Sequence, residues 1–100
     1  MIIHIVNWKL KDNIEEIEKI NNAKLVKEKL EALKGKITEL VKIEVGINFN
    51  ESEAAFDLVL YSEFKTKKDL DSYQNHPEHL KVAAFVKSVV EKRVVVDYER

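Results

Sequence analysis

The sequence contains no cysteine, and its 100 residues include only two glycines and one proline. Without cysteine the chain has no disulfide, no thiolate nucleophile and no cysteine-ligated zinc or iron–sulfur site. The hydrophobic content of 45% and charged content of 35% are typical of an ordered globular chain rather than a disordered or fibrous one. We therefore predict a single folded domain over residues 1–100.

The sequence also lacks an excess charge of either sign and any long apolar run. Its 17 basic and 18 acidic residues give a net charge of −1, whereas nucleic-acid binding usually rests on clustered Lys and Arg. No run approaches the roughly 18 apolar residues that span a bilayer. The apolar residues of Met1–Leu10 are interrupted by His4 and Asn7 and do not resemble a signal peptide. We expect no nucleic-acid or membrane partner and a cytoplasmic location.

Apolar periodicity predicts six secondary-structure elements. Runs rich in apolar residues, partly alternating, predict strands over residues 2–10, 41–49, 56–64 and 93–98. The resulting order of strand, helix, strand, strand, helix, strand is typical of the split βαβ, or ferredoxin-like, arrangement. We predict an α+β fold with a four-stranded antiparallel sheet. The first helix is predicted from one apolar stripe: Ala23, Val26, Leu30, Leu33 and Ile37.

The ends of the first helix and of the second strand are less well marked. Asn21 or Asn22 can cap the helix start, and Gly35 lies where a left-handed residue commonly closes a helix. Residues 11–20 fit either a separate turn or a ragged helix start. In the second strand, Gly46 indicates a bulge or a close approach of the backbone. The residues that we expect on its buried face are Val41, Ile43, Val45, Ile47 and Phe49.

The second helical region begins at a clear signal. Thr66 with Asp69 resembles a capping box, and Tyr73 is expected to face inward together with Leu70. Pro77 suits the first turn of a further helix, where its missing N–H costs nothing. The residues that we expect on the buried side of that helix are Leu80, Ala83, Ala84 and Val90.

Three of the four strands carry apolar residues on both faces. Helices cover only one face of such a sheet, so the second face needs another cover. A second copy packed sheet against sheet would supply it, and we predict a homodimer. The alternative is that residues 11–20 fold over this face.

A few polar and aromatic residues can form a site. His4 shares a strand face with Val6 and Trp8, and the run Tyr73-Gln-Asn-His76-Pro-Glu-His79 contributes a tyrosine and two histidines. Histidine exchanges protons near neutral pH, and a tyrosine hydroxyl can polarise a carbonyl. These residues predict an acid/base or ligand-binding site. Each also has a structural reading: a satisfied core histidine, a helix-start residue, or core aromatics for Tyr73 and Trp8.

Other chemistries have less support. His76 and His79 stand three apart with Glu78 between them, and with His4 they could bind zinc. Pro77 can turn the two imidazoles apart, and no carboxylate stands at a clear ligand spacing, so we expect no metal. No glycine-rich phosphate loop or Gly-x-Ser-x-Gly elbow is present, and we expect no cofactor.

Several segments together resemble one family. The runs are His4–Leu10 (HIVNWKL), Leu30–Ile37 (LEALKGKI), Ile43–Phe49 (IEVGINF), Phe56–Phe64 (FDLVLYSEF), Tyr73–His79 (YQNHPEH) and Val94–Tyr98 (VVVDY). They resemble the Dabb, or stress-responsive A/B barrel, family over nearly the whole chain. The resemblance implies a dimeric α/β barrel in which two ferredoxin-like sheets face each other. Most members of that family have no established activity.

The resemblance also implies two functions. One is a stress-responsive dimer that binds a small apolar or phenolic ligand between sheet and helices, through His4, Trp8, Tyr73, His76 and His79. The other follows a plant polyketide cyclase of the family, which performs an aldol closure without a cofactor. Its acid/base histidines and tyrosine match His4, His79 and Tyr73, and His76 matches as well, although residues 11–20 are longer here. In that polyketide cyclase- or isomerase-like reading His79 removes a proton α to a carbonyl, and Tyr73 and His4 hold the enolate. Monooxygenase activity is suggested only by analogy with other dimeric ferredoxin-like barrels.

Overall fold

The computed structural model describes all residues from 1 to 100. Four strands form one antiparallel sheet in the order β2-β3-β1-β4. The strands are β1 (Ile2–Leu10), β2 (Lys42–Ile47), β3 (Leu58–Phe64) and β4 (Val90–Glu99). The helices are α1 (Glu16–Glu31), the short 3₁₀ helix η1 (Ala32–Gly35), α2 (Lys67–Asn75) and α3 (Pro77–Val89). The predicted ferredoxin-like α+β order is confirmed, with the second helical region divided at His76.

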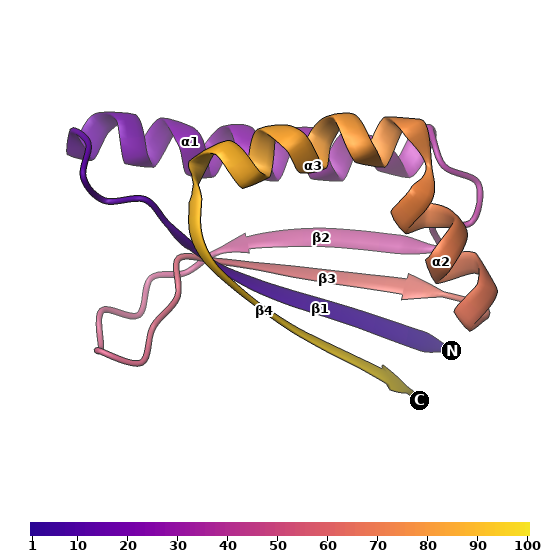
Figure 1. Cartoon of the computed structure of the whole chain (residues 1–100). Coiled ribbons are helices and arrows are strands. Elements are labelled where there is room, and N and C mark those ends of the chain that lie inside the picture. The colour runs from indigo at the N-terminus through magenta and orange to yellow at the C-terminus, as the bar shows by residue number, and fades with distance from the viewer.

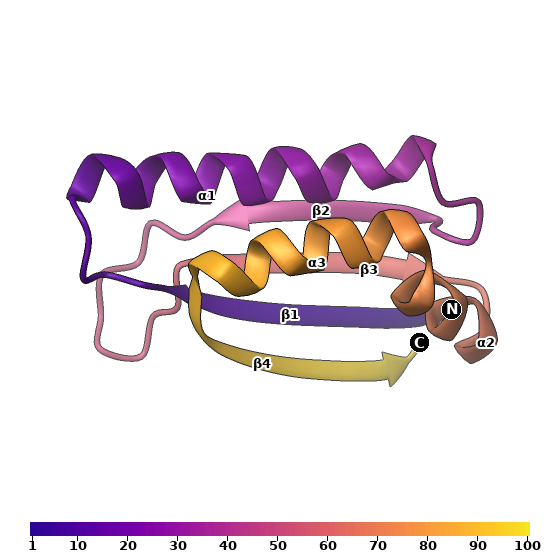
Figure 2. The same ribbon diagram turned by 45° about the horizontal axis from the view of Figure 1, so that its top comes forward.

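The two long helices lie side by side on one face of the sheet, and α2 stands at one end of it (Figure 1). In Figure 2 α1 follows β2, α3 runs beside α1, and β4 curves away along the outer side of β1. Because α3 ends at Val89 and β4 begins at Val90, helix and strand diverge from one point. No helix is both long enough and apolar enough to cross a membrane.

The start of α1 differs from the prediction. The helix begins at Glu16, so Asn21 and Asn22 lie inside it and cap nothing. Acidic side chains in the first turn, Glu16 and Glu18, favour this earlier start because they oppose the helix dipole. Residues 11–20 therefore form a turn and the first helical residues on the helix side of the sheet, and do not cover its other face.

The prediction of a left-handed glycine at the end of the first helix was wrong. No residue of the chain has a positive φ, and α1 instead tightens into η1, which ends at Gly35. The predicted stripe of this helix is confirmed, since Ala23, Val26, Leu30 and Leu33 are all buried.

Strand β2 is shorter and less buried than its alternation predicts. Val45 is buried, but Ile47 is exposed at the strand end and Phe49 lies beyond it with 96% of its surface exposed. The β2–β3 pairing is continuous through Gly46, which excludes a bulge. A Cβ at Gly46 would lie 3.1 Å from Val59 Cγ1, so the predicted close approach is confirmed.

The signals around α2 and α3 are confirmed. Thr66 Oγ1 accepts a hydrogen bond of 3.0 Å from Asp69 N–H, and Pro77 occupies the first turn of α3. The predicted buried side of α3 was wrong at Leu80 and Ala84, which are exposed. Starting the helix at Pro77 turns a different stripe inward, and Val86 is its fully buried member.

The core lies between the helices and the facing side of the sheet. The opposite side, called here the open face, carries no helix (Figure 1). Cross-strand pairs place Ile5 between Tyr61 and Val96 there, with Val94 and Tyr98 on the same side of β4. Val94, Val96 and Tyr98 are exposed. The second apolar face predicted from the sequence is therefore present and uncovered in the monomer.

Candidate functional site

A pocket of about 610 Å³ opens between the sheet and α3. Its lining comes from β1, β3, β4, α1 and α3, and in Figure 2 α3 and β4 diverge from their junction on this side of the molecule. Its apolar lining includes Val6, Trp8, Leu30, Leu60 and Val86. A concave, mostly apolar site with a few convergent polar groups is the usual form of a small-molecule site.

One wall of the pocket carries a histidine that is held by a carboxylate. His4 lies on the central strand β1 and is only 2% exposed, and Asp97 on β4 is its cross-strand partner. His4 Nδ1 lies 2.5 Å from Asp97 Oδ1, and because a carboxylate only accepts, Nδ1 donates. This fixes the ring and leaves Nε2 free.

The opposite wall carries His79 on α3. Its Nδ1 lies 3.1 Å from the carbonyl oxygen of Gln74, so Nδ1 donates and Nε2 is again free. Burial lowers the pKa of His79, and the positive charge of Arg93, together with that of His4 whenever it is protonated, acts in the same direction. His79 is therefore neutral at pH 7 and can accept a proton at Nε2.

Tyr73 on α2 lies beside His79. The two rings are 4.5 Å apart between centroids, and Phe64 packs on the tyrosine at 4.9 Å. The Tyr73 hydroxyl is buried without a hydrogen-bond partner. Burial raises the pKa of Tyr73 well above its usual range, so the hydroxyl stays protonated and can only serve as a neutral donor or acceptor.

The structure brings together most of the residues singled out from the sequence. His4, Trp8 and His79 line the pocket, and Tyr73 packs against the His79 ring but does not itself line the pocket. His76 is not on the pocket wall. It caps α3, with Nδ1 accepting a 3.1 Å hydrogen bond from Glu78 N–H. The contact that His76 makes is therefore the structural one, in which it closes the start of α3.

Zinc ligation by the three histidines has no geometric support. Nowhere in the chain do three His, Asp or Glu side chains gather in an arrangement that could hold a metal ion. His76 Nδ1 accepts the capping hydrogen bond at the start of α3, and His79 Nδ1 donates to a backbone carbonyl.

Sequence reasoning missed Asp97 and the charged residues near the α3–β4 junction. Lys87, Glu91, Lys92 and Arg93 all line the pocket. In this fold the first and last strands pair antiparallel, and an aspartate that follows a valine run lies opposite His4 once the register is known. The register itself is not readable from the sequence, because the run Val94–Val96 is apolar on both faces.

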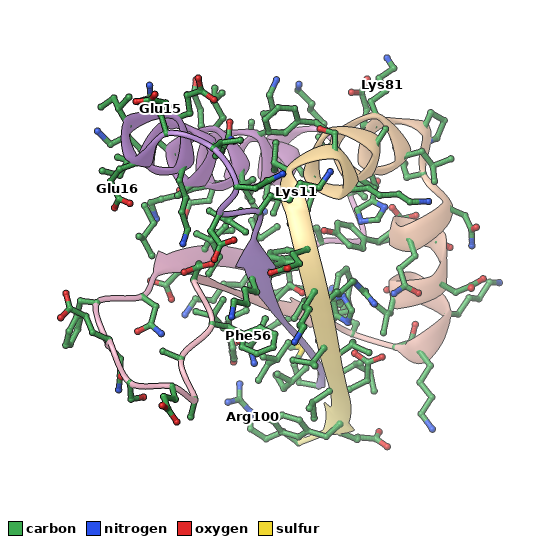
Figure 3. All side chains as sticks on the ribbon, turned by 60° about the vertical axis from the view of Figure 1, so that its left-hand side comes forward. Lys11, Glu15, Glu16, Phe56, Lys81 and Arg100 are labelled. Carbon is green, nitrogen blue, oxygen red and sulfur yellow. The ribbon has the colours of Figure 1, made fainter.

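A second hollow of about 680 Å³ lies against the β2–β3 loop, which extends beyond the sheet (Figure 1). Its lining includes Phe49 and Phe56 but no titratable side chain. Figure 3 places Phe56 on the lower side of the sheet, away from the helices. The acid/base groups belong to the pocket beside α3, which is the candidate site.

The β2-β3-β1-β4 antiparallel sheet with helices on one face defines a ferredoxin-like protein. The family model of the Dabb family, the stress-responsive A/B barrel domain, matches residues 2–100, and the chain belongs to this family. Among solved structures it is similar to a dimeric protein of unknown function and ferredoxin-like fold from Bacteroides fragilis. That match has 40% identity and a TM-score of 0.92, and covers 99% of this chain and 95% of the other.

Two further similarities are weaker. The stress-response A/B barrel domain-containing protein DABB1 of Arabidopsis thaliana is 26% identical over 98% of this chain, which spans only 46% of the length of that relative. A hydroxynitrile lyase from Passiflora edulis is 22% identical, with a TM-score of 0.76 and coverage of 97% of this chain and 90% of the other. The second similarity concerns the fold alone.

Proposed function

We propose that this protein binds a small, largely apolar or phenolic molecule in the pocket between the sheet and α3. The pocket's volume of about 610 Å³ suits a ligand of drug-like size, and its apolar lining provides the burial that drives binding. The two histidines on its walls, His4 and His79, supply hydrogen-bonding groups for a hydroxyl or a carbonyl.

The presence of His4 and His79 in one pocket supports a second candidate function, cofactor-independent acid/base catalysis. Asp97 holds His4 in one orientation, and such a partner is what orients a catalytic imidazole. In this proposal neutral His79 takes the proton from a carbon α to a carbonyl, and the electron pair of that C–H bond moves onto the carbonyl oxygen. His4, when protonated at Nε2, donates a hydrogen bond to that oxygen. The Tyr73 hydroxyl is buried and does not line the pocket, so it adds a second donor only when the ligand reaches past His79.

The hydroxynitrile lyase with a similar fold is consistent with acid/base work in such a scaffold. Lyase chemistry of that kind needs a base and a group that stabilises an anion, and both are available here. The similarity is one of fold, so the argument for this chain rests on its own His4–Asp97 pair and on His79.

A thermal-shift screen with phenolics, β-polyketides and acyl thioesters tests the proposal. A ligand present at a hundred times its dissociation constant adds about 2.7 kcal/mol to the free energy of unfolding. His79→Ala should reduce that shift and abolish any turnover. The matched control is His76→Asn, which removes an imidazole outside the pocket and retains a capping side chain for α3.

Three results separate the readings. A shift that His79→Ala lowers and His76→Asn leaves intact supports binding at the pocket. Turnover that His79→Ala removes while the melting temperature stays near that of the parent supports catalysis. No ligand shift, with His79→Ala melting far below the parent, would mean that the histidine only stabilises the fold.

We also propose that the chain forms a homodimer through its open face. The exposed side chains Val94, Val96 and Tyr98 need a cover, and the 40% identical Bacteroides fragilis protein is described as dimeric. Sheet-to-sheet pairing would leave the pocket accessible, because it opens on the helix side. The location expected from the sequence, the cytoplasm, is part of this proposal and is tested by cell fractionation.

A further inference from the structure

The pocket has a cationic end that the proposed acid/base groups do not explain. Lys87, Lys92 and Arg93 line it near the α3–β4 junction together with one acid, Glu91. None of these four side chains forms an ion pair in the structure. Three cations and one anion leave a local charge of +2, in a chain whose net charge is −1. Free cations at a pocket attract an anion.

The sheet wall places these cations away from the histidine. His4 pairs with Asp97, and Trp8, on the same face, pairs with Arg93. The two pairs are four residues apart along β1, which corresponds to about 13 Å. The backbone positions of His4 and Arg93 are therefore at different ends of the pocket, although the long Arg93 side chain carries its charge close enough to act on the pKa of His79.

The helix wall has the same polarity. His79, Ala83 and Lys87 are four residues apart in sequence and all line the pocket, so they share one side of α3. The rise from His79 to Lys87 is about 12 Å. Both walls thus carry a histidine at one end and a cationic residue at the other, with nearly equal spacing between their backbone positions.

Between the two ends the lining is apolar. Val6 lies midway along the sheet wall and Ala83 midway along the helix wall, while Trp8 and Val86 lie next to the cations. A ligand that satisfies all three zones has an anionic head, an apolar body and a hydroxyl or carbonyl at its far end.

We infer that the pocket takes an elongated organic carboxylate, with its carboxylate at Arg93 and Lys87 and its hydroxyl or carbonyl at His4 and His79. Arg93 is the principal anion group, because a guanidinium presents two parallel N–H donors that match the two oxygens of a carboxylate. Lys87 adds a second charge from the helix wall. This inference rests on the proposed function and names the ligand class of the same site.

The test uses ω-(4-hydroxyphenyl)alkanoic acids of increasing chain length, each paired with its methyl ester, in calorimetric titrations. The ester keeps the phenol and the apolar body and removes only the charge. The acid should bind at least about tenfold more tightly than its ester, the size of a charge-assisted hydrogen bond. This preference should increase with chain length until the carboxylate reaches Arg93.

Arg93→Gln should reduce the acid-to-ester preference to near one and leave the affinity for the ester unchanged. Lys81→Gln is the matched control on α3: Lys81 points outward from the top of the helix (Figure 3) and does not line the pocket. It should leave the preference intact. Raising the salt concentration should weaken binding of the acids and not of the esters.

The outcomes distinguish this inference from the function on which it rests. Equal binding of acid and ester, or a preference that Arg93→Gln leaves unchanged, overturns the inference and leaves the ligand pocket standing. A series in which neither acids nor esters bind overturns both.

Discussion

The Tyr73 hydroxyl is the buried side-chain group that the fold leaves without a partner. Leaving a buried polar group unpaired costs about 1–3 kcal/mol, and such groups in native proteins call for an explanation beyond packing. The Tyr73 ring contributes to the packing, because it lies between Phe64 and His79. Only the oxygen makes no contact that stabilises the fold, and because Tyr73 is 0% exposed a ligand must displace part of the surrounding packing to reach it.

Tyr73→Phe separates the ring from the hydroxyl. Because the oxygen makes no hydrogen bond in the protein, its removal should leave the free energy of unfolding unchanged or raise it by about 1 kcal/mol. Ligand binding or turnover should fall in the same variant. Urea melts and titrations with the phenolic probes measure the two effects. A variant that loses stability and binds as well as the parent would contradict this assignment.

His79 should make the stability of the protein depend on pH in a defined window. Its pKa in the folded protein is lowered from 6.5, chiefly by burial. As pH falls below about 6.5 the unfolded chain takes up this proton first, so the free energy of unfolding decreases until the folded form is protonated as well. Above that pH His79 is unprotonated in both states and no longer makes the free energy of unfolding depend on pH.

The measurement compares unfolding free energies at pH 7.5 and pH 5.5. The parent and His76→Asn should lose stability between these values, and His79→Gln should lose less. The lowered carboxyl pKa values of Glu31 and Glu63 start from 4.5 and act at lower pH. An identical loss in the parent and in His79→Gln would show that another group is responsible.

At the scale of elements, the sequence was sufficient where the local signal and the tertiary contacts agree. Strand β1 was predicted with its observed bounds, since both of its faces are partly apolar. The start of α2 was predictable because the Thr66 cap is a local interaction, and that of α3 because Pro77 fits only the first turn.

The sequence failed where the boundary depends on the rest of the fold. The start of α1 is marked by acids rather than by a capping side chain, since Glu15 makes no side-chain cap bond. In β2 the alternation runs on through Phe49, but the strand ends where its pairing with β3 ends, at Ile47. Periodicity records which residues are apolar, and not how far a partner strand extends.

The candidate site shows the same division between local and long-range information. His4, Tyr73 and His79 could be singled out because histidines and a tyrosine in apolar surroundings suggest proton exchange. Asp97, Lys87 and Arg93 could not, because the contact of Asp97 with His4 depends on the β1–β4 register and the place of Lys87 and Arg93 in the pocket depends on how α3 and β4 are arranged. Charged residues near a chain end otherwise resemble ordinary surface.

At the scale of the whole molecule, the sheet has one face covered by helices and one face without cover. On the open face, Val96 is exposed and lies beside Ile5 at the centre of the first and last strands. Burying such a face in a second copy removes apolar surface from water on both copies at once. A lysine at this position would have to be buried without a partner in the dimer.

Val96→Lys should therefore convert the protein from a dimer into a monomer of 11.7 kDa. Light scattering at micromolar concentration measures the mass of the particle in solution directly. The matched control is Leu25→Lys, which places the same charge on a partly exposed apolar residue of α1, on the helix side, and should remain dimeric. If the parent itself is a monomer at this concentration, or if Val96→Lys keeps the mass of a dimer, the open face is not the interface. If Val96→Lys is a folded monomer that still binds the phenolic probes, the pocket beside α3 is complete within one chain.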